Sequence, residues 1–218
     1  MKIAVLLAGS GVFDGSEIYE TTLTLLALDR ADVRYQCMAP NITQAQVINH
    51  ITGEVMPGEK RNVLIEAARL ARGEIIDLKV ANAVDFDALI VPGGFGVAKN
   101  LCDFAFKGAD MQINTEVRDF IREVHRAGKP VGLICIAPTM AAQLFGEGVT
   151  CTIGSNEEVA AAIESMGGKH VQCAVDECVV DEERKVVTTP AYMEAGRIRE
   201  AAAGIEKLVE KILSMTKN

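Results

Sequence analysis

One cysteine of the sequence stands where an α/β protein can place a nucleophile. Cys135 follows the apolar run Val131–Ile134 and precedes Pro138 and Thr139, which begin a helix-like segment. This pattern predicts a buried strand that ends in a sharp turn into a helix, with the cysteine at the turn. The backbone N–H groups after the turn and the positive end of the helix would favour a thiolate there. A buried apolar cysteine is the alternative, and the local pattern leaves both open.

A glycine-rich loop near the start of the chain carries the next candidate. The segment Gly9–Gly15, G-S-G-V-F-D-G, does not complete G-x-G-x-x-G and has Asp14 where a phosphate would lie, which excludes a nicotinamide or flavin site there. Glu17 has two interpretations. With Asp14 as the N-cap, it is the third residue of a helix in a capping box. Alternatively it carries protons at the edge of the sheet, and the sequence alone favours the cap.

Two further segments could contribute to a site. The apolar strand Phe86–Val91 ends in the glycine-rich loop Pro92–Gly96, whose free N–H groups could form half of an oxyanion hole. A tight turn from strand to helix explains the same glycines. Between residues 41 and 59 the pattern predicts only a short helix near Ile42–Ile48, followed by His50 in a loop. A lone histidine in a loop is usually structural, so His50 is a secondary candidate.

The order of the elements indicates how these segments come together. Lys2–Ala8 and Phe86–Val91 are continuous apolar runs, typical of strands that are covered on both faces. Helical patterns, such as that over Thr115–Ala127, separate the strands. The alternation predicts right-handed crossovers and a mainly parallel sheet. Ligands collect outside the carboxyl ends of such strands, where both glycine-rich loops and Cys135 would meet.

Composition limits the classes of function. A chain of 218 residues without a linker or an internal repeat is predicted to form one domain over residues 1–218. The net charge of -8 argues against partners such as nucleic acid or an anionic membrane. No apolar run is long enough to cross a bilayer. The six cysteines contain no C-x-x-C pair, so we expect reduced thiols in a soluble, cytoplasmic protein.

Several segments resemble one family of proteins. They are G-S-G-V-F-D-G-S-E at Gly9–Glu17, I-N-H-I-T-G-E at Ile48–Glu54, R-N-V-L-I-E-A-A-R at Arg61–Arg69, V-P-G-G-F-G at Val91–Gly96, C-I-A-P at Cys135–Pro138 and T-T-P-A-Y-M at Thr188–Met193. In this order they resemble the ElbB family, a branch of the PfpI-like superfamily that is related to class I glutamine amidotransferases. The resemblance implies a flavodoxin-like three-layer α/β/α sandwich with a cysteine nucleophile elbow.

The resemblance also implies roles for individual residues. Cys135 matches the nucleophile, and Glu17 matches a glutamate whose carboxyl group hydrogen-bonds the thiol. Gly94 and Ile136 match the positions whose N–H groups form the oxyanion hole. Peptidase-type relatives have a histidine where this chain has Ile136, and others supply one where it has Ile153–Ser155. Without an imidazole to activate the nucleophile, peptidase and glutamine amidotransferase activities are not expected.

The function implied by the resemblance is that of a glyoxalase that needs no glutathione, metal or other cofactor. Its substrate would be a small 2-oxoaldehyde, glyoxal or methylglyoxal, which becomes a 2-hydroxy acid through a hemithioacetal on Cys135. Relatives are commonly homodimers, and His50 and Tyr192 are candidate pocket residues. Two alternatives remain open: a redox-sensing or small-molecule-binding protein that uses the same cysteine, and a regulator linked to isoprenoid biosynthesis.

Overall fold

A computed structural model describes residues 1–216 and has a seven-stranded central sheet in the order β3-β2-β1-β4-β5-β9-β8. All neighbouring strands in it are parallel except β8 and β9. The sheet strands are β1 (Lys2–Leu6), β2 (Arg34–Ala39), β3 (Ile75–Asp77), β4 (Ala88–Val91), β5 (Val131–Ile134), β8 (Val179–Asp181) and β9 (Val186–Thr189). β6 (Thr150–Cys151) and β7 (Lys169–His170) form a separate pair. The predicted mainly parallel sheet is confirmed.

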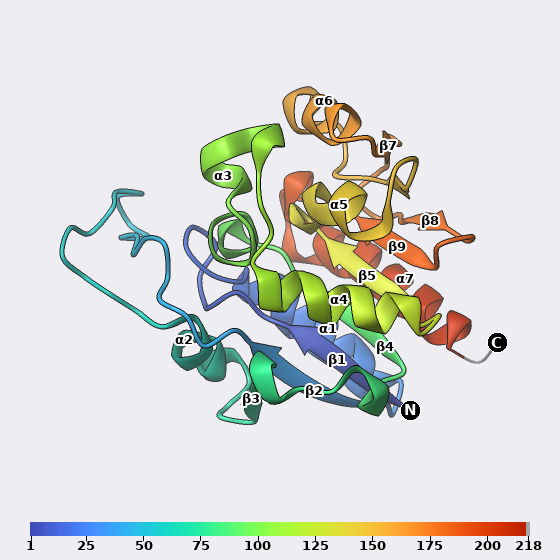
Figure 1. Cartoon of the computed structure of the whole chain (residues 1–218), viewed down its shortest axis with the longest axis horizontal. Helices are drawn as coiled ribbons and strands as arrows, with labels where there is room; N and C mark the ends of the chain where they lie inside the picture. The colour runs from blue at the N-terminus through green and yellow to red at the C-terminus, as the bar shows by residue number, and fades with distance from the viewer. Residues whose placement is uncertain (217–218) are drawn as a thin grey trace.

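Helices cover both faces of the sheet. On one face α1 packs against α7, with α2 beside α1 over β2 and β3, and on the other α4 covers β4 and β5 with α5 beside it. Figure 1 shows α4 in front of the strands, with α1 and α7 behind them. The helices are α1 (Ile18–Arg30), α2 (Val63–Leu70), α3 (Phe104–Lys107), α4 (Thr115–Arg126), α5 (Ala141–Phe145), α6 (Glu157–Ser165) and α7 (Ile198–Met215). The predicted three-layer α/β/α sandwich is therefore confirmed.

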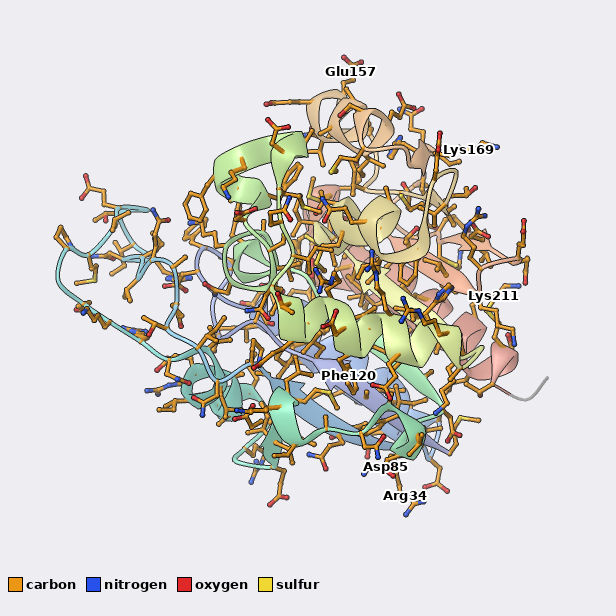
Figure 2. All side chains as sticks on the ribbon, in the orientation of Figure 1. Arg34, Asp85, Phe120, Glu157, Lys169 and Lys211 are labelled. Carbon is orange, nitrogen blue, oxygen red and sulfur yellow. The ribbon has the colours of Figure 1, made fainter. Side chains whose placement is uncertain are left out.

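The hydrophobic pattern of the sequence explains the layers. Every residue of β4 and β5 is buried, as continuous apolar runs predict for strands covered on both faces. α4 is amphipathic and buries Phe120, labelled in Figure 2, whose ring lies 6.3 Å from that of Phe86 in an edge-on arrangement. Because the central strands point the same way, their carboxyl ends form one edge of the sheet. The loops at that edge build the site described below.

The segment between β2 and α2 differs from the prediction of a helix near Ile42–Ile48. Residues 41–62 run as an extended arm, which projects from the body in Figure 1, with an isolated bridge between Ile48 and Val55. Two N–H groups of the predicted helix bond side chains outside the segment: that of Ala45 donates to Asn100 Oδ1 at 2.9 Å and that of Ile48 to Asp14 Oδ2 at 2.8 Å. That of Gln44 donates across the arm to the carbonyl of Arg61 at 2.8 Å. The helix prediction is wrong because these long-range acceptors replace the bonds that a helix would make within itself.

The charged side chains are distributed over the molecule. Figure 2 shows Arg34 and Asp85 at the bottom of the view, Glu157 on α6 at the top and Lys211 on α7 at the right. Within residues 1–216, no helix is both long and apolar enough to span a bilayer. All six cysteines lie in this range and are free thiols.

Candidate active site at the cysteine elbow

Cys135 occupies the sharp turn that the sequence predicts at the end of β5. Its φ of 62° lies in the left-handed region that a side chain rarely adopts. The N–H of Cys135 donates to the carbonyl of Thr189 at 2.9 Å, so β9 holds the turn in register with the sheet. A 3₁₀ turn over Ala137–Met140 then leads into α5. A strained conformation held by neighbouring strands is typical of a functional site, since packing alone would not require it.

The two glycine-rich loops lie against each other beside this turn. The N–H of Glu17 donates to the carbonyl of Gly93 at 2.9 Å, and the N–H of Gly96 donates to that of Gly15 at 2.9 Å. A Cβ on Gly94, whose φ is 100°, would collide with the N–H of Glu17 and the carbonyl of Gly15. Glycine is needed at this position so that the two loops can approach each other and the thiol.

The thiol of Cys135 receives backbone donors from both sides. The N–H groups of Gly94 and Ile136 are hydrogen-bond donors to the sulfur and lower its pKa. The carboxyl group of Glu20 is also hydrogen-bonded to it. Burial and then the charge of Glu20 raise the pKa of Cys135 well above its usual value, although the two N–H donors oppose this. The resting residue is therefore a neutral thiol with a proton acceptor beside it.

Glu20 lies in the first turn of α1 and is fully buried. Its oxygens accept the N–H of Gly93 at 2.8 Å and that of Tyr192 at 3.1 Å, so three segments meet at one carboxyl group. Burial, followed by the charge of Glu17, raises the pKa of Glu20 to about 7, while the hydrogen bonds lower it. A carboxyl group with such a pKa can both accept and return a proton near neutral pH.

Glu17 does not make the contact expected of it. Glu17 itself is the N-cap of α1, and its Oε2 accepts the N–H of Glu20 at 2.6 Å. The predicted capping box with Asp14 as the N-cap is wrong, since Asp14 bonds the arm instead. The carboxyl group hydrogen-bonded to Cys135 belongs to Glu20, one helical turn further on. Burial raises the pKa of Glu17 as well.

The sequence contains a signal that could have identified Glu20. Residues three apart on a helix lie on one face, so the E-x-x-E of Glu17 and Glu20 places both carboxyl groups on the same side of the first turn. A glutamate on the buried face of an apolar helix is uncommon unless it has a partner. The role was predicted for the glutamate that begins the helix, whereas the carboxyl group beside the thiol belongs to the one that follows it by three residues.

A cavity of about 270 Å³ opens over the thiol. Glu17, Cys135 and the candidate pocket residue Tyr192 line it. The ring of Tyr192 lies 6.1 Å from that of Tyr19. The apolar lining consists of Val12, Phe95, Ala98, Phe104, Ala105, Ile136, Val159 and Met193, with Gly94 and Asn156 completing the wall. Glu20 is not part of the lining, so of the two glutamates only Glu17 would face a bound molecule.

His50 lies away from the cavity, which corrects its assignment as a pocket residue. Its Nε2 accepts the N–H of Phe13 at 3.2 Å, and its Nδ1 donates to the carbonyl of Ile48 at 3.0 Å. Both ring nitrogens therefore fasten the arm to the glycine-rich loop. The interpretation of His50 as a structural residue fits these contacts.

The site contains no imidazole at the positions where related enzymes carry one. Ile136 follows the nucleophile, and at Ile153–Ser155 the hydroxyl of Ser155 donates to Glu194 Oε1 at 2.5 Å. Across residues 1–216, the structure groups no three His, Cys, Asp or Glu side chains in a way that could hold a metal ion. The groups available for proton transfer at the thiol are thus carboxyl groups.

The fold and the site define a class: three-layer α/β proteins with a cysteine elbow at the carboxyl edge of a parallel sheet. Comparison with protein families gives the same result, because the model of the DJ-1/PfpI family matches residues 1–196. The chain belongs to the DJ-1/PfpI family.

Several individual proteins are similar to this chain over most of its length. The chain is 44% identical to the human "Glutamine amidotransferase-like class 1 domain-containing protein 3, mitochondrial", over 99% of this chain and 83% of the human protein. It is 34% identical to "ES1 protein, mitochondrial" of Danio rerio, over 88% of this chain and 77% of that protein. A crystal structure of an isoprenoid biosynthesis protein with an amidotransferase-like domain from Ehrlichia chaffeensis superposes with a TM-score of 0.92, at 38% identity and 99% coverage of both chains.

The names of these relatives correct one expectation. The human and zebrafish relatives are both named as mitochondrial proteins, as is the ES1 protein homolog of Rattus norvegicus, 42% identical to this chain. The expected cytoplasmic location is therefore wrong. It was based on composition, and composition does not distinguish the cytoplasm from another aqueous compartment with reduced thiols.

Proposed function

We propose that the protein is a cofactor-independent, glyoxalase-like enzyme that converts glyoxal or methylglyoxal into a 2-hydroxy acid. One observation carries the proposal: the thiol of Cys135 lines a cavity with two N–H donors, one buried carboxyl group and one carboxyl group that faces the cavity. Nucleophilic addition followed by proton transfer between carbons needs these groups and no imidazole.

The first step is addition to the aldehyde. The sulfur of Cys135 bonds to the aldehyde carbon while the carbon–oxygen π bond breaks. Glu20, which is hydrogen-bonded to the thiol, accepts the sulfur's proton, and its pKa of about 7 makes it a suitable acceptor near neutral pH. The N–H groups of Gly94 and Ile136 stabilise the charge that develops on the oxygen, which then receives the proton back from Glu20 to give the hemithioacetal.

The second step moves a proton between the two carbons of the substrate. Glu17 removes the proton from the carbon that bears sulfur, and the electron pair of that bond forms an enediolate with the neighbouring carbonyl. Glu17 then returns the proton to the neighbouring carbon, while the hydroxyl proton of the first carbon moves to the oxygen of the second. The product is a thioester of a 2-hydroxy acid, and hydrolysis by water releases the acid and the thiol. Burial raises the pKa of Glu17 and so strengthens it as a base, and its place on the cavity wall supports this assignment.

The alternative of a redox sensor is less well supported by the same geometry. The carboxyl group of Glu20 beside the sulfur could stabilise a sulfinate, but sensor cysteines have a lowered pKa and are exposed to the oxidant. Cys135 is only 7% exposed, and burial raises its pKa. A neutral thiol with an adjacent base is better suited to addition at a carbonyl group than to direct oxidation.

We further propose that the chain belongs to the ElbB branch of its family. The matched segments from Gly9–Glu17 to Thr188–Met193 support this assignment, as does the similarity to the isoprenoid biosynthesis protein of Ehrlichia chaffeensis. A regulatory role in isoprenoid metabolism would not need the thiol. A cellular phenotype that survives Cys135→Ala would therefore favour regulation over catalysis.

The decisive experiment follows methylglyoxal consumption and lactate formation by the purified protein without glutathione. We expect turnover in the wild type and its loss in Cys135→Ala and Glu17→Gln. Turnover that is indifferent to Cys135, or consumption without lactate, would contradict the proposal. Peroxide-dependent addition of oxygen at Cys135 in the absence of aldehyde turnover would instead support the sensor.

A further inference from the structure

The cavity over Cys135 is more apolar than a small 2-oxoaldehyde requires. Its wall is built from the glycine-rich loop, the segment 95–105, the start of α6 and the turn 191–193, and these segments contribute mainly aliphatic and aromatic side chains. Phe104 and Val159 are only partly buried and pack against the core from the cavity side. A methyl group would cover a small part of this wall and leave the rest in contact with water.

The wall carries few polar side chains, those of Glu17, Asn156 and Tyr192. The carboxyl group of Glu17 and the N–H of Gly94 lie beside Cys135. Asn156 is the N-cap of α6, and its Oδ1 accepts the N–H of Val159 at 3.0 Å. The wall as a whole therefore offers few hydrogen-bonding groups to a substituent and much apolar surface to contact.

The charges around the cavity exclude an anionic substrate. Among the described residues that line it, the one ionisable carboxyl group is that of Glu17 and none is lysine or arginine. Lys99, next to the wall residue Ala98, donates to the carbonyl of Phe13 at 2.9 Å and lies over the ring of Phe95. A phosphate or carboxylate on the substrate would find no free cation on this wall and would be repelled by Glu17.

We infer that the cavity takes an uncharged 2-oxoaldehyde whose ketone carbon carries an alkyl or aryl group larger than methyl. This inference rests on the proposed glyoxalase-like function. The aldehyde carbon lies at the sulfur, and the substituent extends over Phe104 and Val159. The remote group then contributes binding energy that orients the reacting carbons.

The test is a homologous series in which only the apolar group grows: methylglyoxal, 2-oxobutanal, 2-oxopentanal and 2-oxohexanal. Each methylene removed from water is worth about fourfold in binding, so kcat/KM should rise by at least about tenfold along the series. A flat or falling series in an enzyme that turns over methylglyoxal would overturn the inference and leave the proposed function intact.

Two matched variants in α3 test whether the preference for longer substrates depends on the cavity wall. Phe104→Asn makes the cavity wall polar, and we expect it to reduce the ratio of kcat/KM between 2-oxohexanal and methylglyoxal by at least about fivefold. Phe106→Asn changes a phenylalanine two residues away, 52% exposed and outside the lining, and should leave the ratio unchanged. Equal effects of the two variants would contradict the assignment of the wall.

A labelling experiment separates failure of the inference from failure of the proposed function. The rates at which N-methylmaleimide and N-butylmaleimide modify Cys135 are compared by peptide mass mapping, with the partly exposed Cys173 as the internal reference. We expect the butyl reagent to be favoured at Cys135 by at least about fivefold more than at Cys173. If no aldehyde is turned over, the proposed function fails. In that case a high preference for the butyl reagent at Cys135 relative to Cys173 still supports the apolar preference of the cavity. A relative preference near one overturns it.

Discussion

Two strands of the same sheet each carry a buried cysteine, and only one of them forms a site. Cys37 lies within β2, paired in register with Val5 of β1 and Ile75 of β3, and is 1% exposed. Cys135 follows the last residue of β5 and is 7% exposed. Burial is the largest cause of a raised pKa for both thiols.

The difference lies in what surrounds each sulfur. Burial alone raises the pKa of Cys37 to about 12, and the residue behaves as a small apolar side chain. Cys135 has a φ of 62°, two N–H donors, the carboxyl group of Glu20 and an adjoining cavity. Burial therefore does not distinguish a structural thiol from a functional one. The position at the strand end does, because only there can donors, an acceptor and a substrate reach the sulfur.

The prediction with the largest expected effect compares alanine substitutions of the two cysteines. Cys135→Ala should lower methylglyoxal turnover by at least about 1,000-fold, because it removes the nucleophile. Cys37→Ala should leave kcat/KM within about twofold and lower the free energy of unfolding by about 1–2 kcal/mol, because it leaves a small void in the core. Lactate formation and denaturant melts of both variants provide the measurements. Similar activity losses in the two variants would mean that Cys135 acts through packing.

The sequence predicted the strands of the sheet more accurately than the contacts between segments that are distant in the chain. The apolar runs of β1, β4 and β5 and the position of Cys135 follow from local pattern, because a strand covered on both faces has few alternatives. The arm at residues 41–62 was misjudged because the acceptors of two of its N–H groups, Asn100 and Asp14, lie far away in the sequence. The local periodicity of the sequence does not predict such long-range hydrogen bonds.

The same limit explains the two glutamates. Glu17 and Glu20 both lie in one helical turn, and only the approach of β5 to α1 determines which carboxyl group reaches the thiol. The resemblance to a family favoured Glu17, and the contact belongs to Glu20. His50 was misplaced for a related reason, since its bonds to Phe13 and Ile48 depend on how the arm folds back.

The second prediction concerns the pH dependence of stability. Burial raises the pKa of Glu20 from its usual 4.5 to about 7, so the folded state keeps a proton that the unfolded chain releases. The stability linked to this proton is fully present below pH 4.5 and is lost as the pH rises through 7. Between pH 5 and 8 the wild type should lose about 2–3 kcal/mol more than Glu20→Gln, which has no proton to release.

Urea melts at pH 5, 6, 7 and 8 measure this difference. Cys37→Ala is the matched control from the other strand, and it should keep the pH slope of the wild type because its carboxyl groups are unchanged. If Glu20→Gln showed the same pH slope of the free energy of unfolding as the wild type, the prediction would be contradicted. The buried carboxyl group would then be ionised throughout the range.

The smallest expected effect separates the two roles of Glu20. Its charge and its hydrogen bond both raise the pKa of Cys135, so Glu20→Gln should increase the thiolate fraction. Alkylation of Cys135 by iodoacetamide at pH 8 should then become about tenfold faster for each unit by which the pKa falls. Turnover of methylglyoxal should become slower, because the residue that takes the thiol proton is missing.

Opposite changes in the two rates are what a proton acceptor predicts and a packing residue does not. A packing defect would loosen the elbow and expose the sulfur, and it would then speed alkylation of the buried Cys37 as well, which is 1% exposed in the native fold. We therefore expect Cys37 to stay unmodified in Glu20→Gln while Cys135 reacts faster. Equal acceleration at both sulfurs would mean that Glu20 stabilises the fold and does not act as a proton acceptor for Cys135. The thiols of Cys37 and Cys135 would then differ less than their surroundings indicate.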